Sequence, residues 1–172
     1  ADVDDPQPLP VITVDEPSFA PATNYVAPLT NAPLRNFGGE TCGGTLFEIL
    51  RESCNSAYAR MGAELIGPEA LTARATAFGF NDTPPIDLPD AARSTFPTDY
   101  GKKLQTVDAY YAKQNGQPVP TTLPDARPPV YVYEDTPKLA QVSIGQNDVR
   151  ATPLEMALVA AGVANDGKIM VP

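Results

Sequence analysis

Apolar side chains recur three or four positions apart over much of the chain, and this spacing predicts amphipathic α-helices. The first expected helix covers 45–54, where Thr45 and Glu48 stand at the spacing of a capping box. Its charged side chains would turn away from the interior. Its apolar face would consist of Leu46, Ile49 and Leu50.

Five further helices are expected from the same pattern and from helix start and stop signals. One runs through Ala57, Tyr58, Met61 and Leu65, and the others cover 68–78, 98–114 (with Leu104, Val107 and Tyr111 on one side), 136–144 and 153–165. Pro68 suits the first turn of its helix, and Gly79 suits the end. The strongest start signal places Thr152 as an N-cap, Pro153 at the first helical position and Glu155 as the capping-box partner.

Proline-rich segments separate the expected helices. Residues 1–35 hold seven prolines, and because proline fixes φ and lacks an amide proton, long helices are excluded there. This segment is expected to be an extended, surface-wrapping loop with one short strand at 11–14. Residues 81–97 and 116–129 are also expected to be loops. We therefore expect a mostly helical chain with long loops and very few strands.

Composition narrows the classes of function. The chain has 172 residues, of which 42% are hydrophobic, enough for one globular domain with a core. The net charge of −9 argues against nucleic acid as a partner, because phosphate neutralisation needs clustered Lys and Arg. The sequence has no apolar run long enough to cross a membrane and no signal-peptide pattern. Histidine is absent, so neither a histidine metal site nor a Ser-His-Asp triad is expected, and no cofactor is implied.

Cys42 and Cys54 are the two cysteines of the chain. Two thiols alone do not define a metal site. In an extracytoplasmic compartment they could form a disulfide, provided that Cys42 folds back along the helix at 45–54 and the Cα atoms come within about 7 Å. Gly43 and Gly44 supply backbone freedom for that path. Two free, small apolar side chains are the alternative.

Four blocks of sequence carry a further signal through their order along the chain. They are Arg35-Asn36-Phe37-Gly38-Gly39-Glu40 with Ser53-Cys54-Asn55-Ser56-Ala57-Tyr58, then Phe78-Gly79-Phe80 with Ile86-Asp87-Leu88-Pro89, then Leu139-Ala140-Gln141-Val142-Ser143-Ile144-Gly145-Gln146 with Ala151-Thr152-Pro153-Leu154-Glu155-Met156-Ala157, and last Ala164-Asn165-Asp166-Gly167-Lys168. A lone Ser-x-Asn tripeptide arises often by chance. In this order, however, the blocks resemble the middle of a class B penicillin-binding transpeptidase of the penicillin-binding protein A type.

That resemblance implies an α+β fold of the penicillin-binding/β-lactamase-like transpeptidase type, of which this chain would supply mainly the helical subdomain and long loops. Residues 1–172 would form the central part of one domain, with a proline-rich loop region at 1–34 and a helical part with the Ser-x-Asn motif at 35–172. The family also uses Ser-x-x-Lys and Lys-Thr-Gly motifs, and neither occurs in this sequence. We therefore expect a central fragment of the domain that is inactive by itself.

The activity implied by the resemblance is peptidoglycan D,D-transpeptidation. A serine outside this chain would form an acyl-enzyme with one stem peptide, the amine of a second stem peptide would resolve it, and β-lactam antibiotics would mimic the first substrate. The implied partners are stem peptides, β-lactams, the remaining segments of the same domain and a membrane glycan polymerase. The implied location is the extracytoplasmic face of the bacterial cell membrane, with an anchor outside this chain. The alternatives are a non-catalytic scaffold or β-lactam sensor on the same fold, and an unrelated helical binding module.

Ser53 and Asn55 are the candidate catalytic residues by that resemblance. The hydroxyl of Ser53 would bridge the motif lysine and the leaving nitrogen, since a hydroxyl both donates and accepts a proton. The amide of Asn55 would bind substrate by donating to its peptide carbonyl, and its oxygen would hold the motif lysine. The alternative is that both side chains only cap the second helix, because Ser and Asn are favoured N-caps.

Overall fold

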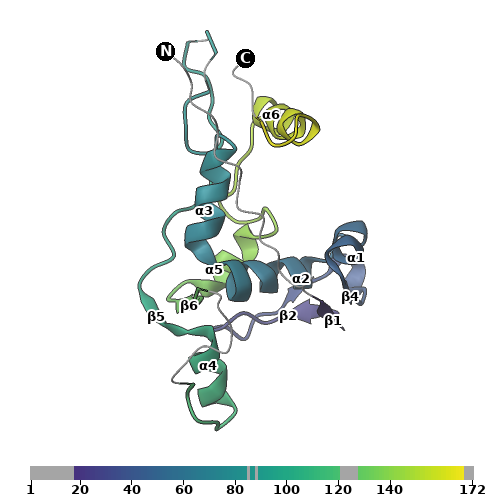
Figure 1. Cartoon of the computed structure of the whole chain (residues 1–172), viewed down its shortest axis with the longest axis vertical. Coiled ribbons are helices and arrows are strands. Elements are labelled where there is room, and N and C mark those ends of the chain that lie inside the picture. The colour runs from purple at the N-terminus through teal and green to yellow at the C-terminus, as the bar shows by residue number, and fades with distance from the viewer. Residues whose placement is uncertain (1–17, 85, 88, 121–127, 169–172) are drawn as a thin grey trace.

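The computed structural model describes residues 18–84, 86–87, 89–120 and 128–168. In Figure 1, α2 and α5 lie in the middle of the molecule, and α4 and α6 lie towards its opposite ends. The helices are α1 (Leu46–Arg51), α2 (Asn55–Arg60), α3 (Gly67–Ala77), α4 (Val107–Gln114), α5 (Thr136–Val142) and α6 (Pro153–Ala164), with a 3₁₀ turn at Phe37–Gly39 and a π-helical segment at Met61–Ile66. The strands are β1 (Phe19–Ala22), β2 (Asn24–Tyr25), β3 (Leu34–Arg35), β4 (Cys42–Gly44), β5 (Lys103–Thr106) and β6 (Tyr131–Tyr133). This mixture confirms the expected α+β class.

The strands of the described residues pair antiparallel in three two-stranded sheets, β1 with β4, β2 with β3 and β5 with β6. The expectation of very few strands, and of a loop throughout the proline-rich segment, is therefore wrong: β1, β2 and β3 lie before residue 36. Pro21 sits inside β1, because a two-stranded sheet leaves one edge without partner hydrogen bonds and tolerates proline there. The strand expected at 11–14 lies outside the described residues.

Residues 98–114 form a strand and a shorter helix instead of the single helix expected. β5 pairs with β6, with Lys103 opposite Tyr133. Thr106 then caps α4, because its Oγ1 accepts a hydrogen bond from Ala109 N at 3.2 Å. Pairing with a strand far along the chain therefore overrides the helical spacing in the first half of the segment, and the helical pattern holds only within α4.

The other expected helices have the predicted type. The segment through Leu65 is α2 continued by the π-helical turn, and 68–78, 136–144 and 153–165 are confirmed as α3, α5 and α6. Pro68 lies in the first turn of α3, and Gly79 follows its end with a positive φ of 100°. The described residues of 81–97 and 116–129 form no helix, which confirms these two segments as loops.

Helix α1 buries less than its apolar pattern indicates. Ile49 is fully buried, whereas Leu46 and Leu50 are exposed and Phe47 is exposed to 80%. The predicted apolar face is therefore wrong except at Ile49. The helix has six residues and packs on β4, so a single apolar side chain reaches the core from it.

The core consists of three clusters of side chains, two of which include residues of α2. Close packing of α5 on the π-helical segment depends on Gly62, because a β-carbon there would lie 1.8 Å from Ser143 Oγ. The first cluster contains Phe19, Cys42, Ile49, Cys54 and Ala57, the second contains Tyr25, Ala27, Ala59, Ala63 and Ala140, and the third contains Tyr100, Tyr133, Leu139 and Val142. Each cluster thus combines residues of a helix with residues from parts of the chain that lie far away in the sequence.

A buried carboxylate lies in the π-helical segment that continues α2. Glu64 Oε1 accepts hydrogen bonds from the hydroxyls of Tyr25, at 2.9 Å, and Tyr111, and Oε2 accepts from Arg60 Nε at 3.0 Å. The Glu64 side chain is only 6% exposed. Burial, together with the neighbouring carboxylate, raises the pKa of both tyrosines, so they stay protonated and donate. One side chain therefore joins β2 and α4 to the helical core.

The two predicted capping boxes differ in the structure. At α1, Thr45 N donates to Glu48 Oε2 at 2.7 Å and Glu48 N donates to Thr45 Oγ1 at 3.4 Å, so the box is confirmed. At α6, Thr152 Oγ1 accepts from Glu155 N at 3.1 Å, which confirms the N-cap. Thr152 N, however, donates to Ser94 Oγ at 3.0 Å, so Glu155 as the box partner is wrong.

The carboxylate of Glu155 turns inward instead of capping α6. The residue is 6% exposed, and Oε1 has no hydrogen-bond partner among the described residues. Gly79 leaves room for it, because a β-carbon there would lie 3.1 Å from Glu155 Oε2. Burial raises the pKa of Glu155 above its ordinary value, since removing the carboxylate from water disfavours the ionised form.

We expect Glu155→Gln to raise the melting temperature of the protein at pH 7. Because the folded-state pKa of Glu155 is raised, the ionised carboxylate costs stability at neutral pH, and that cost disappears below the ordinary carboxyl pKa of about 4.3. The gain should therefore vanish at about pH 3.5. Thermal unfolding at both pH values measures it, with the exposed Glu40→Gln as the control. Equal melting temperatures for the two variants at pH 7 would count against a buried, uncompensated carboxylate.

Glu64→Gln is expected to lower the free energy of unfolding by about 2 kcal/mol, because it weakens three hydrogen bonds to a buried charge. The matched control is Glu69→Gln. Glu69 also accepts from a tyrosine, Tyr133, and pairs with a lysine, Lys103, but its side chain is 68% exposed. That variant should cost less than about 1 kcal/mol. Urea denaturation compares the two, and equal losses would contradict the role of burial.

Candidate active site at the start of α2

The candidate residues lie on the turn that joins α1 to α2. Glu52 ends α1, Ser53 has a positive φ of 53°, and Cys54 is the N-cap of α2. Cys54 N donates to Ile49 O at 2.9 Å, and Ser53 N donates to Leu50 O at 3.1 Å. These two bonds define a Schellman motif, in which the residue with positive φ is usually glycine. A serine at that position adds a side chain at a backbone cost of about 1 kcal/mol.

Ser53 and Asn55 line one hollow of about 440 Å³ at the protein surface. Cys54, between them, is fully buried and points into the core. The structure therefore brings both candidate residues to one concave surface. The remaining lining residues are Asn36, Phe37, Glu40, Cys42 and Glu52.

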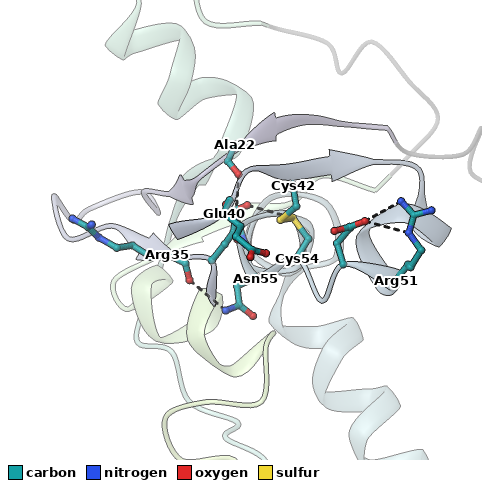
Figure 2. The surroundings of a disulfide bond; sticks show 10 residues. Ala22, Arg35, Glu40, Cys42, Arg51, Cys54 and Asn55 are labelled. Atoms are coloured by element: carbon teal, nitrogen blue, oxygen red, sulfur yellow. Dashed lines mark hydrogen bonds and ion pairs between the residues drawn. A yellow bond between two sulfur atoms is a disulfide. The ribbon is translucent and has the colours of Figure 1, made fainter. Parts of the chain in front are cut away.

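The amide of Asn55 is held from outside the helix. Its Nδ2 donates to Arg35 O at 3.3 Å, as the dashed line in Figure 2 shows. The side chain of the N-cap residue, Cys54, accepts no hydrogen bond from a backbone N–H of α2. In the described part of the chain, neither Ser53 nor Asn55 caps α2, so the simple capping role is not what this structure shows.

Asn36 is the residue at this site that the sequence alone did not single out. Its Oδ1 accepts from Ser56 N at 2.8 Å. Its Nδ2 donates to Ala22 O at 2.8 Å and to Glu40 O at 2.9 Å. The side chain is buried and ties three chain segments together. Its place in the block at 35–40 was the available signal, but nothing in that block shows what an asparagine there binds.

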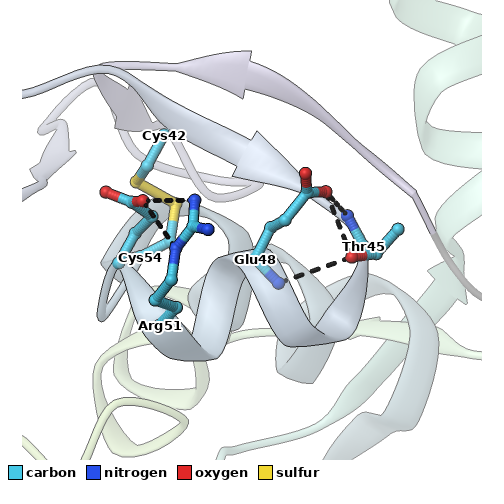
Figure 3. Close-up of polar contacts among 6 residues, drawn as sticks. Cys42, Thr45, Glu48, Arg51 and Cys54 are labelled. Carbon is cyan, nitrogen blue, oxygen red and sulfur yellow. Dashed lines mark hydrogen bonds and ion pairs between the residues drawn. A yellow bond between two sulfur atoms is a disulfide. The ribbon is translucent and has the colours of Figure 1, made fainter.

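Cys42 and Cys54 are joined by a disulfide, with their Cα atoms 5.8 Å apart. Figures 2 and 3 show the bond linking the start of β4 to the turn after α1, while the Thr45–Glu48 capping box lies at the other end of α1. Gly43 allows β4 to approach β1, because a β-carbon there would lie 2.7 Å from Phe19 O. The bond therefore ties the β1–β4 sheet directly to the candidate motif.

The hollow is lined by hydrogen-bonding residues and by two acidic residues, Glu40 and Glu52. A hydroxyl and a primary amide can bind a peptide-like ligand through donors and acceptors. The lining contains no lysine or histidine that could act as a base for Ser53. Among all the described residues, no group of three or more His, Cys, Asp or Glu side chains is placed to hold a metal ion. No helix among them is long and apolar enough to cross a membrane.

Known proteins resemble this chain in sequence over most of its length. The family model described as "Penicillin binding protein transpeptidase domain" matches residues 21–172. Peptidoglycan D,D-transpeptidase PbpA of Mycolicibacterium smegmatis is 36% identical over 149 residues, which cover 84% of this chain and 23% of that protein. The protein of the same name from Mycobacterium tuberculosis is 34% identical over 149 residues, with the same shares. The chain thus spans less than a quarter of the length of these curated relatives.

Solved structures share the fold. The imipenem acyl-enzyme complex of penicillin-binding protein A from M. tuberculosis superposes with a TM-score of 0.66 at 28% identity, covering 92% of this chain and 29% of that chain. PBP2 of Pseudomonas aeruginosa in complex with WCK 5153 gives a TM-score of 0.63 at 19% identity, over 91% of this chain and 29% of that chain. The second similarity concerns the fold alone.

We expect Cys42→Ser to lower the free energy of unfolding by about 2–3 kcal/mol, because the disulfide closes a short loop with a sequence separation of 12. A reductant should destabilise the unmodified protein and leave the variant unchanged. Urea denaturation with and without reductant measures both effects, and the exposed neighbour Thr41→Ser is the control. Equal stability of the unmodified protein under the two conditions would show that the bond does not support the turn.

Proposed function

The chain belongs to the penicillin-binding protein transpeptidase family, and on that premise we propose that the protein containing it is a peptidoglycan D,D-transpeptidase. It would cross-link stem peptides through a serine acyl-enzyme, and β-lactams would acylate the same serine. The proposal assigns the nucleophile and the motif lysine to residues outside these 172, because no serine here has a lysine three positions later and Lys-Thr-Gly is absent. The described residues would supply the Ser-x-Asn part of the site.

The observation that carries the proposal is the placement of Ser53. It occupies the positive-φ position of a Schellman motif, where glycine would satisfy the backbone without strain. The residue lines the hollow beside Asn55. Strained, non-glycine positions of this kind gather at active sites. A strained serine that faces a hollow supports a role for its hydroxyl.

The proposed role of Ser53 is proton transfer. In the first step the nucleophilic serine oxygen bonds to the carbonyl carbon of the D-Ala-D-Ala amide, and the C–N bond breaks. The proton from the serine must reach the leaving nitrogen. The Ser53 hydroxyl can accept a proton on one side while donating on the other, so it carries no lasting charge. The amine of a second stem peptide then attacks the ester carbonyl carbon, the C–O bond to the serine breaks, and the proton lost by the amine returns to the serine oxygen.

The proposed role of Asn55 is substrate binding. An amide has two N–H donors, and one of them already donates to Arg35 O. That bond fixes the amide plane. The second N–H is then available for the peptide carbonyl of the substrate, and Oδ1 is available for the motif lysine.

We infer an extracytoplasmic location, because a disulfide such as Cys42–Cys54 persists in oxidising compartments. A membrane anchor and a membrane glycan polymerase as partner come from the family resemblance and stay predictions. Acceptance of stem peptides and β-lactams rests on the family and on the hydrogen-bonding groups of the hollow.

The proposal is tested by treating the complete protein with a labelled penicillin. We expect a covalent label that survives denaturation and maps to a serine outside residues 1–172 of the sequence printed here. A complete protein that takes up no label would favour the non-catalytic scaffold. A label on any residue of this chain would overturn the assignment of the nucleophile.

Ser53→Gly in the complete protein is expected to stabilise the fold and to slow its acylation. Glycine relieves a backbone cost of about 1 kcal/mol at positive φ, while loss of the hydroxyl should lower the acylation rate constant about 100-fold. The control is Asp90→Gly, another exposed position with positive φ, which should leave the rate unchanged. Unaltered acylation of Ser53→Gly would show that the hydroxyl has no catalytic part.

A further inference from the structure

We propose that Asn36 is a positioning residue of this active site: it holds the first turn of α2 and thereby sets the direction of Asn55. The inference rests on the proposed function, because it concerns the orientation of a substrate-binding amide. Asn36 itself would act through the helix and not on substrate.

The side chain of Asn36 is only 6% exposed, and its hydrogen bonds run to three different segments. Both N–H donors are used, one on Ala22 O at 2.8 Å and one on Glu40 O at 2.9 Å. The oxygen accepts from Ser56 N at 2.8 Å. A buried amide with all three bonds made has one allowed orientation, because a flip would oppose like groups at every contact.

The bond to Ser56 replaces the cap that α2 lacks. Ser56 N belongs to the first turn of α2, where N–H groups have no partner inside the helix. An N-cap side chain normally binds this group, but Cys54 is committed to the disulfide and makes no such bond. Asn36 therefore caps α2 from a distant loop.

Arg35, the last residue of β3, and Asn36, which follows it, bind two consecutive residues of α2. The carbonyl of Arg35 accepts from the side chain of Asn55, and the next residue, Asn36, accepts from the backbone of Ser56. Residues 35–36 and the start of α2 are thus joined by two adjacent hydrogen bonds. If the Asn36 bonds are lost, the Arg35 carbonyl shifts and Asn55 loses its fixed amide plane, at the point where a displacement of about 1 Å can cost a large factor in rate.

Asn81 is a remote asparagine whose side chain also makes two hydrogen bonds to the backbone of another segment. Its Nδ2 donates to Phe96 O at 3.0 Å, and its Oδ1 accepts from Phe96 N at 2.9 Å. It does not line the hollow that contains Ser53 and Asn55. Asn81→Ala removes two side-chain hydrogen bonds from another loop and places alanine at a positive φ of 70°, so it is a control that loses stability away from the site.

The test uses the complete protein and measures the second-order rate constant of acylation by a labelled penicillin, together with the melting temperature. Asn36→Ala and Asn81→Ala should both lower the melting temperature. Only Asn36→Ala should slow acylation, by about tenfold or more at a temperature where both variants are folded. Equal effects of the two variants on the rate constant would overturn the proposal.

A double variant separates positioning from loss of structure. If Asn36 acts through Asn55, Asn36→Ala should have no further effect on the rate constant when Asn55→Ala is already present. An additive loss in the double variant would contradict the proposal.

Asn36→Asp gives a second readout if Asn36→Ala does not fold. The aspartate keeps the acceptor for Ser56 N but loses both donors and faces two carbonyl oxygens. Acylation should therefore be faster than in Asn36→Ala, or slowed by less than about tenfold relative to the unmodified protein if that variant is absent, although the melting temperature is no higher. Acylation that simply follows the melting temperature across the variants would refute positioning. If the unmodified protein itself is not acylated, the proposed function fails instead.

Discussion

The start of α2 is held by two long-range ties, and the geometry of the candidate site depends on them. The disulfide binds Cys54 to β4, and Asn36 binds the first-turn amide of Ser56. Helices as short as α1 and α2, with six residues each, are not stable by themselves. Packing and these two ties therefore determine the turn between the helices, and Ser53 and Asn55 take their directions from that turn.

The far end of the same helical run is fixed by a different chemistry. Glu64, in the π-helical segment, gathers Tyr25, Tyr111 and Arg60, and so joins the run to β2 and α4. The disulfide and the side-chain amide of Asn36 thus hold the start of α2, and the buried carboxylate of Glu64 holds the π-helical segment that follows it. Side chains that must meet groups from another part of a protein need a backbone that is held in this way, because small errors in position weaken every contact.

Local signals were sufficient for the start of α1 and insufficient for the segment that leads into α4. Thr45 and Glu48 interact within one turn, so the sequence contains the whole information for that cap. The pairing of Lys103 with Tyr133 joins distant parts of the chain, and no spacing of apolar residues could show that it replaces a helical turn. At the site, the order of the blocks identified the Ser-x-Asn motif, whereas the bonds of Asn36 are a property of three segments that meet only in the folded chain.

The central claim is that the turn between α1 and α2 presents Ser53 and Asn55 to a ligand bound by the rest of the protein. The most direct measurement is a crystal structure of the complete protein acylated by penicillin G. We predict Asn55 Nδ2 at about 3 Å from the carbonyl oxygen of the ligand's side-chain amide, with the disulfide and the Asn36 bonds intact. A covalent complex in which those ties are intact but that distance exceeds about 4 Å would contradict the claim.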